Sequence, residues 1–337
     1  MSWWILHTFS VIFVLIGEYH LYLDTNYRIM KTAFLLTLSL IVLIGSSFAQ
    51  LKSLEPIPLD ESWKQIIYEL APAQTQAPIS KKHQVLLFSL FTGFDHWVIP
   101  HAEVVIETLA QKTGAYEIVK STDISMFEKK QLRQFDAIIL NNNCSIGPKR
   151  DLFYDALEQN GPMSEEDRTK KAAELEDNLL TFVRKGGGLA VIHGGIVMQN
   201  NSKEVSEMMG GSFDYHPPQQ HIELKIADEQ HPLTLAFEGQ SFTHIDEPYI
   251  FKNAYVKKQF RPMLYMEVSK IRKLKQELPD EVSYVSWIKS YGKGKVFYCS
   301  PSHNAQSYEN TRILQYYLNG MQYVLGDLKC DDAPLYQ

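Results

Sequence analysis

The sequence has few cysteines and no large charge of either sign, and both absences narrow the range of functions. Only 3 of its 337 residues are cysteine, and no CxxC pair occurs. A thiolate zinc site, a dithiol redox motif and a full disulfide framework are therefore excluded. Cys144 and Cys299 each end an apolar stretch, and we expect both to be buried free thiols. The net charge of −6 offers no electrostatic basis for binding nucleic acid.

Several common catalytic motifs are also absent. The glycines at 186–188 follow an expected helix and precede an expected strand, which reverses the order of a dinucleotide-binding turn, and they lack GxGxxG spacing. The chain has no Walker A motif and no GxSxG, which makes a standard serine esterase improbable. No HxH or HxxxH pair occurs, so spacing along the chain gives no support for a metal. We expect no cofactor, with zinc as the open alternative.

Two apolar stretches lie near the start of the chain. Residues 30–49 have the parts of a secretory signal peptide: Lys31, an apolar core, and a small-x-small site that ends at Ala49. Residues 1–29 then read as an over-called extension before a start at Met30, and their apolar run is short for a membrane span. We expect a periplasmic or secreted protein. The alternative is a membrane anchor formed by uncleaved apolar segments.

The remaining sequence predicts one α/β domain over residues 81–326. Residues 50–80 contain Pro56, Pro58, Pro72 and Pro78 and predict a linker with one short helix at 61–70, and residues 327–337 form a tail. Strands are expected at 85–90, 116–119, 135–140, 189–192, 222–226, 284–288 and 295–299, and helices after Pro100, at 164–184 with Ser164 as N-cap, and at 308–325. Continuous apolar strands that alternate with helices indicate a mostly parallel sheet with helices on both faces.

One expected strand ends in an unusual turn. The stretch GGGLAVIHGG at 186–195 has the pattern of a nucleophile elbow, in which a strand, a sharp turn and an exposed side chain follow one another. Elbows of this kind carry Ser or Cys, whereas this one carries His193. We therefore expect the turn to hold an imidazole at the edge of the sheet.

Other histidines also follow expected strands. Ligands of open α/β sheets bind beyond the carboxyl ends of the strands, and His96, Asn142, His193 and His303 stand there. Two further segments carry chemistry: a Gly-Gly segment that ends in His216-Pro-Pro, and a run with the residues His244, Asp246, Glu247 and Tyr249. For Asp246 and Glu247 the choice lies between a solvated turn and a carboxylate pair for acid–base work.

These motifs together resemble the ThuA-like (trehalose utilisation) family. The matching blocks, in order, are Thr92-Gly93-Phe94-x-His96, the elbow 186–193, 210–218 with His216, His231-Pro232, Asp246-Glu247-x-Tyr249, and Trp287 to Tyr298 with His303 after it. The resemblance implies a flavodoxin-like sheet of the class I glutamine amidotransferase-like fold and a role in carbohydrate metabolism. It also implies no glutaminase activity, because the family has His where amidotransferases carry their nucleophilic Cys. Two positions depart from the family pattern: Ser302 replaces a common Gly, and Asp95 a frequent basic residue.

The resemblance and the residues together predict an enzyme acting on a sugar or keto-glycoside. We expect His193 or His216 as general base, with Asp246 or Glu247 as its partner acid or orienting group. The expected substrate-binding residues are His96, Asn142, His244, Tyr249 and His303, while Trp287 fits core packing better than stacking on a sugar. The expected partner is a small carbohydrate, and no oligomeric state is predicted. The alternatives are a non-catalytic carbohydrate-binding protein and a zinc-dependent hydrolase.

Overall fold

The computed structural model describes residues 54–335 of the chain. The expected extension at 1–29 and the expected signal peptide at 30–49 lie outside these residues. The described residues belong to one compact unit, and the description below concerns that unit alone. Within residues 54–335, no helix combines the length and the apolar character needed to cross a membrane.

A sheet of nine strands in the order β2-β1-β3-β4-β11-β10-β9-β6-β7 forms the centre of the unit. Its parallel part contains β1 (Gln84–Phe88), β2 (Glu117–Ser121), β3 (Ala137–Asn141), β4 (Gly188–Ile192) and β11 (Gly294–Cys299). The antiparallel part contains β6 (Gln220–Ile226), β7 (Phe242–Asp246), β9 (Arg261–Glu267) and β10 (Val282–Tyr291). A separate antiparallel pair consists of β5 (Ser212–Tyr215) and β8 (Ile250–Lys252).

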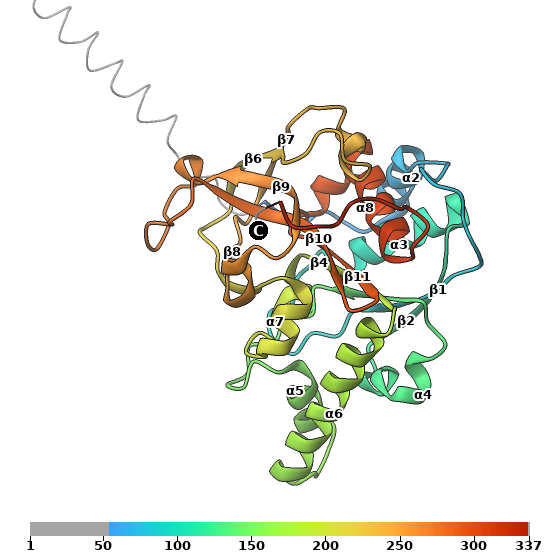
Figure 1. Ribbon diagram of the computed structural model, residues 1–337, viewed down its shortest axis with the longest axis vertical. Coiled ribbons are helices and arrows are strands. Elements are labelled where there is room, and N and C mark those ends of the chain that lie inside the picture. The colour runs from blue at the N-terminus through green and yellow to red at the C-terminus, as the bar shows by residue number, and fades with distance from the viewer. Residues whose placement is uncertain (1–53, 336–337) are drawn as a thin grey trace, which may run out of the picture. The chain divides into compact units, whose positions relative to one another are not determined.

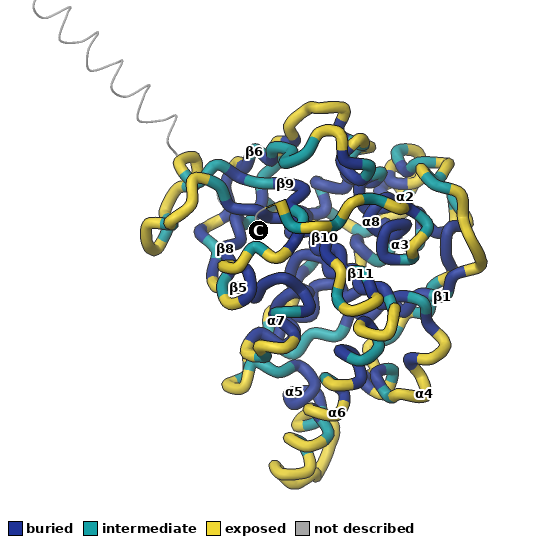
Figure 2. Tube along the Cα trace, in the orientation of Figure 1, coloured by how far each residue is buried: buried dark blue, intermediate teal, exposed yellow. Residues whose placement is uncertain are grey.

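Helices cover the sheet in two groups, which Figure 1 shows on either side of the central strands. One group contains α2 (Glu61–Leu70), α3 (Ile99–Thr113) and α8 (Thr311–Val324), and the other contains α5 (Leu152–Gln159), α6 (Glu165–Arg184) and α7 (Lys203–Met209). The short α4 (Lys129–Leu132) precedes β3. Every residue of β3 and β4 is buried, as expected for strands covered on both faces, and Figure 2 shows this buried interior. The predicted α/β, flavodoxin-like fold is confirmed.

Local signals in the sequence account for the ends of these helices. Pro100 lies in the first turn of α3, where its missing N–H is not needed, and Gly114 ends the helix at a φ of 66°. The Ser164 hydroxyl accepts a hydrogen bond from the N–H of Asp167 at 3.1 Å, as the predicted N-cap requires. The glycines after α6 then lead the chain directly into β4.

The segment before β1 is packed rather than extended away from the domain. Helix α2 has the expected bounds, and its Trp63 and Ile67 are buried. The Trp63 ring meets the edge of His101 at a centroid distance of 4.7 Å, and its indole N–H donates to Glu309 at 3.0 Å. Residues 54–80 of the expected linker therefore form part of the same unit as the sheet.

Candidate active site

The turn after β4 has the backbone geometry of an elbow. His193 adopts a φ of 43°, in the left-handed region that a residue with a side chain rarely occupies, and it begins a short 3₁₀ turn. At Gly194 a Cβ would lie 2.9 Å from both Cys144 Sγ and His96 Cε1. Glycine is therefore required here, because it lets the His96 ring approach the elbow.

The hydrogen bonds of His193 fix the position of its proton. Its Nδ1 lies 2.6 Å from the carbonyl oxygen of Ser300, and a carbonyl can only accept, so Nδ1 carries the hydrogen. In the neutral ring, Nε2 then presents a lone pair. That atom lies 3.5 Å from Glu247 Oε2 and 3.3 Å from His303 Nδ1.

Glu247 connects the buried histidines to a more exposed one. Its Oε2 lies 3.2 Å from His303 Nδ1, and its Oε1 lies 3.6 Å from His216 Nε2. His96 completes a group of four side chains whose nitrogen or oxygen atoms all lie within 4.8 Å of one another. We call His96, His193, Glu247 and His303 the histidine–glutamate cluster.

Burial and hydrogen bonding set opposite charges within the cluster. Burial favours a neutral Glu247, but the contacts with the imidazoles of His193 and His303 outweigh it and hold the pKa of Glu247 far below its usual range. Burial likewise opposes charge on His303, but the hydrogen bond to Glu247 prevails and raises the pKa of His303. Burial and the neighbouring histidines lower the pKa of His96, which stays neutral.

A cavity of about 240 Å³ opens next to the cluster. The residues that line it come from the ends of several strands and the loops that follow: Phe94, His96, Cys144, Ile146, Arg150, Val197, Phe213, His216, Glu247 and Tyr249. His193 and His303 are buried and contact this lining through Glu247. A bound molecule would therefore meet the carboxylate, two imidazoles and several apolar walls.

The structure brings six of the predicted site residues together. They are His96, His193, His216, Glu247, Tyr249 and His303. The Tyr249 ring lies over His193 at a centroid distance of 4.3 Å and stacks on His216 at 5.8 Å. Tyr249 is thus positioned to pack against a ligand and to hold both imidazoles in place.

The other three predicted residues lie outside the cavity lining and support it. The Asp246 carboxylate accepts hydrogen bonds from the backbone N–H groups of Ser302 and His303 at 2.7 and 3.2 Å. His244 Nδ1 contacts the Ser307 hydroxyl at 2.9 Å, and Asn142 accepts from the N–H of Gly194 at 3.2 Å. Asp246, His244 and Asn142 therefore contact groups that surround the site, and their predicted roles in catalysis or substrate binding stay predictions.

Sequence reasoning missed one polar residue of the cavity. Arg150 lines it and has a φ of 53°, an uncommon conformation for a residue with a side chain. It lies in the loop after β3, further along the chain than the asparagines that directly follow the strand. The strand-end rule points first to residues directly after a strand, so Arg150 is predictable only when the whole loop is considered. Trp287, by contrast, is a core residue as predicted, and its indole N–H donates to the Met209 carbonyl at 2.7 Å.

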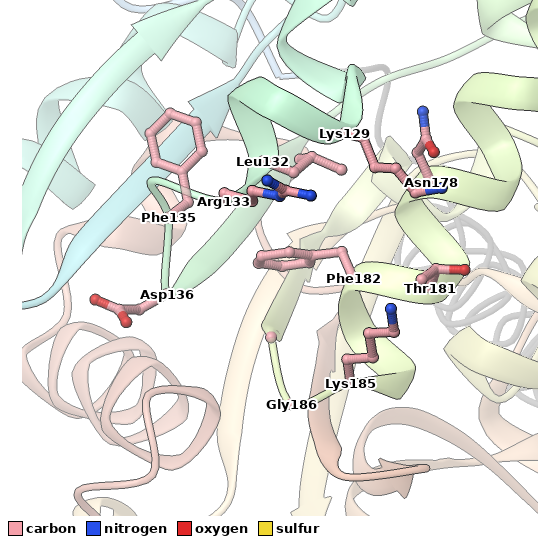
Figure 3. Close-up of a pocket in the computed structure, with 11 residues that line it drawn as sticks. Lys129, Leu132, Arg133, Phe135, Asp136, Asn178, Thr181, Phe182, Lys185 and Gly186 are labelled. Atoms are coloured by element: carbon pink, nitrogen blue, oxygen red, sulfur yellow. The ribbon is translucent and has the colours of Figure 1, made fainter.

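A second cavity lies at the opposite ends of the parallel strands. It has a volume of about 380 Å³ and lies beside Asp136 and Gly187, which immediately precede β3 and β4. Figure 3 shows Lys129, Arg133 and Lys185 around it. It contains none of the predicted site residues, and it is at the amino ends of the strands, where open α/β sheets do not usually bind their ligands.

Comparison with known proteins decides the family. The family model for trehalose utilisation (ThuA) matches residues 84–324, which include the whole cluster. The chain belongs to the ThuA family. This membership suggests a carbohydrate-related role. None of the curated proteins matches the sequence.

Two solved structures show the same fold as this ThuA-family chain. A ThuA-like protein from Bacteroides uniformis has 15% sequence identity and a TM-score of 0.55, and the match covers 74% of this chain and 94% of that one. A ThuA-like protein from Parabacteroides merdae has 14% identity and a TM-score of 0.50, with 74% and 92% covered. At these identities the likeness is one of fold alone.

Proposed function

We propose that this ThuA-family protein acts on a sugar or keto-glycoside by acid–base chemistry and has no glutaminase activity. One observation carries the proposal: the Glu247 carboxylate contacts His193 and His303 behind the cavity and His216 beside it. A carboxylate that connects imidazoles of different burial provides groups that can accept and donate protons near neutral pH.

The reaction that fits these groups is removal of a proton next to a carbonyl. In a keto-glycoside, a base takes the proton from the carbon beside the carbonyl, and the electron pair moves onto the carbonyl oxygen. When the pair returns, the glycosidic oxygen leaves the neighbouring carbon with a proton from an acid. This elimination needs a base, an acid and a group that stabilises the oxyanion, but neither a nucleophile nor a nucleotide.

His216 is better placed than His193 to be the base. The Pro217 carbonyl lies 2.9 Å from His216 Nδ1 and fixes the proton there, so that Nε2 presents its lone pair beside Glu247. The His216 side chain is 37% exposed, whereas that of His193 is fully buried behind Glu247. His96 and Arg150 line the same cavity and supply N–H groups for the developing oxyanion.

The size and the walls of the cavity suit a single sugar ring. Its volume of about 240 Å³ lies below the roughly 300–1,000 Å³ of pockets for drug-sized ligands. Phe94, Phe213 and Tyr249 provide aromatic faces beside the polar groups. We infer that one ring occupies the cavity and that the rest of a glycoside extends past the exposed side chains of Phe94 and Ile146.

Glutaminase chemistry does not fit the site. The elbow carries His193, and imidazole does not form the thioester that an amidotransferase needs. The nearby Cys144 is not a substitute, because burial raises the pKa of its thiol to about 12 and keeps it protonated.

The proposal is tested with a panel of keto-glycosides and the purified protein. We expect cleavage, together with exchange of the hydrogen beside the carbonyl for deuterium from the solvent. His216→Ala should lower both rates at least 100-fold, consistent with loss of a general base. His221→Ala, which changes an exposed histidine of β6, is the matched control and should leave both rates unchanged. Binding of sugars with neither cleavage nor exchange in the wild type would favour a carbohydrate-binding protein instead.

We also propose that the protein is exported, on the basis of the signal-peptide pattern at residues 30–49. Expression of the full sequence in a bacterium, followed by mass spectrometry of the mature N-terminus, tests this. Export predicts a chain that begins at Gln50 and is found outside the cytoplasm, whereas an uncleaved chain in the membrane fraction would indicate an anchor.

A further inference from the structure

We propose that the histidine–glutamate cluster is a binding site for a divalent transition-metal ion, with Zn²⁺ as the ion that it fits best. His193 Nε2, His303 Nδ1 and Glu247 Oε2 are the three central ligands, and His96 is the fourth. The inference deepens the proposed function and rests on the same site, but metal binding can be measured without any turnover.

The distances between the ligand atoms carry this inference. Zn²⁺ binds imidazole nitrogen and carboxylate oxygen at about 2.0–2.2 Å, so two such ligands of a tetrahedral ion lie about 3.3–3.5 Å apart. The three pairs of atoms in the cluster are 3.2, 3.3 and 3.5 Å apart. Each edge of one tetrahedral face is therefore already close to its metal-bound length.

The arrangement of the rings agrees with these distances. The ring centroids of His96, His193 and His303 form a triangle with three sides of 5.2 Å. The three imidazoles thus surround one point in a symmetric way. The ligand atom of His96 lies within 4.8 Å of the other three, so a small inward movement of that ring completes four-fold coordination.

Hydrogen bonds around the cluster hold its ligands as metal sites require. A histidine that binds a metal usually donates its other ring N–H to a carbonyl or a carboxylate, which fixes the tautomer. His193 does this through Nδ1 and the Ser300 carbonyl at 2.6 Å. Asp246 accepts from the backbone N–H of His303 and so fixes the start of that side chain. The elbow itself, with its left-handed backbone, fixes His193.

The types of ligand select the class of ion. Imidazole suits zinc and the neighbouring transition metals, whereas magnesium and calcium prefer ligand sets made only of oxygen. Three imidazoles and one carboxylate carry a single negative charge when their metal-binding atoms are unprotonated, as metal binding requires. Glu247 and His96 also line the cavity, so a bound ion would lie where the oxygen of a substrate can reach it.

A bound ion would leave only one of the two candidate bases, His193 and His216, able to accept a proton. It occupies the Nε2 lone pair of His193, which then cannot accept a proton. His216 would stay available, because it contacts Oε1 of Glu247, whereas Oε2 is the oxygen that faces His193. An ion held by these residues would supply Lewis-acid polarisation of a substrate carbonyl, and His216 would remain the group that removes the neighbouring proton.

The test measures metal binding directly. The full chain, purified without a histidine tag, is stripped with a chelator, exposed to Zn²⁺, passed through a desalting column and analysed by mass spectrometry for metal. We expect one zinc per chain, and substitution by Co²⁺ should give the intense visible absorption of a tetrahedral site. His303→Ala and Glu247→Gln should each weaken zinc binding at least 100-fold in calorimetric titrations.

Control variants show whether zinc binds at the cluster or elsewhere on the protein, and whether a loss of binding is due to misfolding. His216→Ala keeps all four ligands, and His221→Ala removes an exposed histidine, so both should bind zinc within threefold of the wild type. Circular dichroism and denaturant unfolding show whether the ligand variants fold. Since Co²⁺ absorption uses the wild type, the inference stays testable even if a ligand variant unfolds.

The outcomes distinguish the metal from the reaction. Loss of all zinc on the desalting column, or an octahedral Co²⁺ spectrum, would overturn the metal site. Full turnover by stripped protein would also overturn it as a catalytic site, while the acid–base proposal would stand. Stable binding of one zinc without turnover of any keto-glycoside would leave the metal site standing and remove the proposed reaction.

Discussion

The Asp246 carboxylate holds Ser302 in an unusual backbone conformation. Its Oδ2 accepts a hydrogen bond from the N–H of Ser302 at 2.7 Å, and the φ of Ser302 is 100°. This region of backbone space suits glycine and strains residues with a Cβ. The strain lies directly before His303, so the segment that carries this member of the cluster is held in place by a buried carboxylate.

Ser302→Gly should therefore stabilise the protein. Relief of strain is worth roughly 1–3 kcal/mol, and the greater freedom of glycine in the unfolded chain offsets about 0.5–1 kcal/mol of it. We expect a net gain of about 1 kcal/mol in the free energy of unfolding, measured with urea. Ser302→Ala is the control, because it loses the contact of the hydroxyl with Tyr317 at 3.4 Å but keeps the strain. A glycine variant no more stable than the alanine variant would contradict this explanation.

Asp246→Asn should weaken the site without changing any of the four proposed metal ligands. The carboxylate accepts from the N–H groups of Ser302, His303 and Glu247, and an amide has only one oxygen for these donors. We expect a loss of about 2 kcal/mol in unfolding free energy and of roughly 10-fold or more in zinc affinity. Urea unfolding and calorimetry measure the two effects. Asp214→Asn, an exposed change on β5, should alter neither. Unchanged zinc affinity in folded Asp246→Asn would remove the positioning role.

Gly194→Ala should push His96 away from the elbow. The new Cβ would lie 2.9 Å from both Cys144 Sγ and His96 Cε1, and overpacking of this kind costs about 1–3 kcal/mol. We expect lower stability in urea and weaker zinc binding. Adding Cys144→Ala removes the sulfur contact and should restore part of the stability, while the contact with His96 remains. A double variant that loses as much stability as the two single variants lose together would show that the contact between the new Cβ and the Cys144 sulfur does not cause the loss of stability.

His231 should make stability depend on pH. Its Nδ1 accepts from the N–H of Leu233 at 3.2 Å, its Nε2 donates to the Asp331 carbonyl at 2.9 Å, and burial lowers its pKa below the usual 6.5. The folded state therefore binds this proton more weakly than the unfolded state does. The stabilising contribution of neutral His231 is complete above about pH 6.5 and is lost as the pH falls below it, by up to about 1.4 kcal/mol per pH unit.

The measurement compares the wild type with His231→Gln between pH 8 and pH 5. Urea unfolding of the wild type should show a steeper loss of stability below pH 6.5 than unfolding of the variant. The comparison is needed because burial also lowers the pKa of His101, which adds to the pH dependence of both proteins. Parallel curves for the two proteins would show that His231 does not titrate in this range.

The sequence predicted the parallel half of the fold better than the antiparallel half. Strands such as β4 are continuous apolar runs bounded by glycine or helix signals, and these patterns are local. The strands β7 and β9 and the pair β5 and β8 gave no such signal, because their side chains alternate irregularly between buried and exposed positions. Their pairing depends on contacts between distant parts of the chain, which the sequence pattern does not show.

The sequence predicts where the site lies on the sheet, but it does not predict which side chains face one another there. The strand-end rule placed His96, His193 and His303 at one edge of the sheet, where they lie. It could not separate Asp246 from Glu247, because adjacent residues at the end of β7 point to opposite sides. One carboxylate therefore faces the histidines, and the other faces the backbone of 302–303. The absence of HxH and HxxxH spacing does not argue against the proposed metal site, since its four residues come from four separate loops.

The four residues of the cluster come from distant parts of the sequence, so the site forms only when the whole domain has folded. His96 follows β1, His193 follows β4, Glu247 follows β7 and His303 follows β11. Since β7 is at the far edge of the antiparallel part and β11 lies in the parallel part, the cluster assembles only after both parts have formed. During synthesis its last member emerges about 200 residues after the first. Occupancy of the cluster would thus be a late event in folding, and a bound ion would stabilise the finished domain rather than guide its early stages.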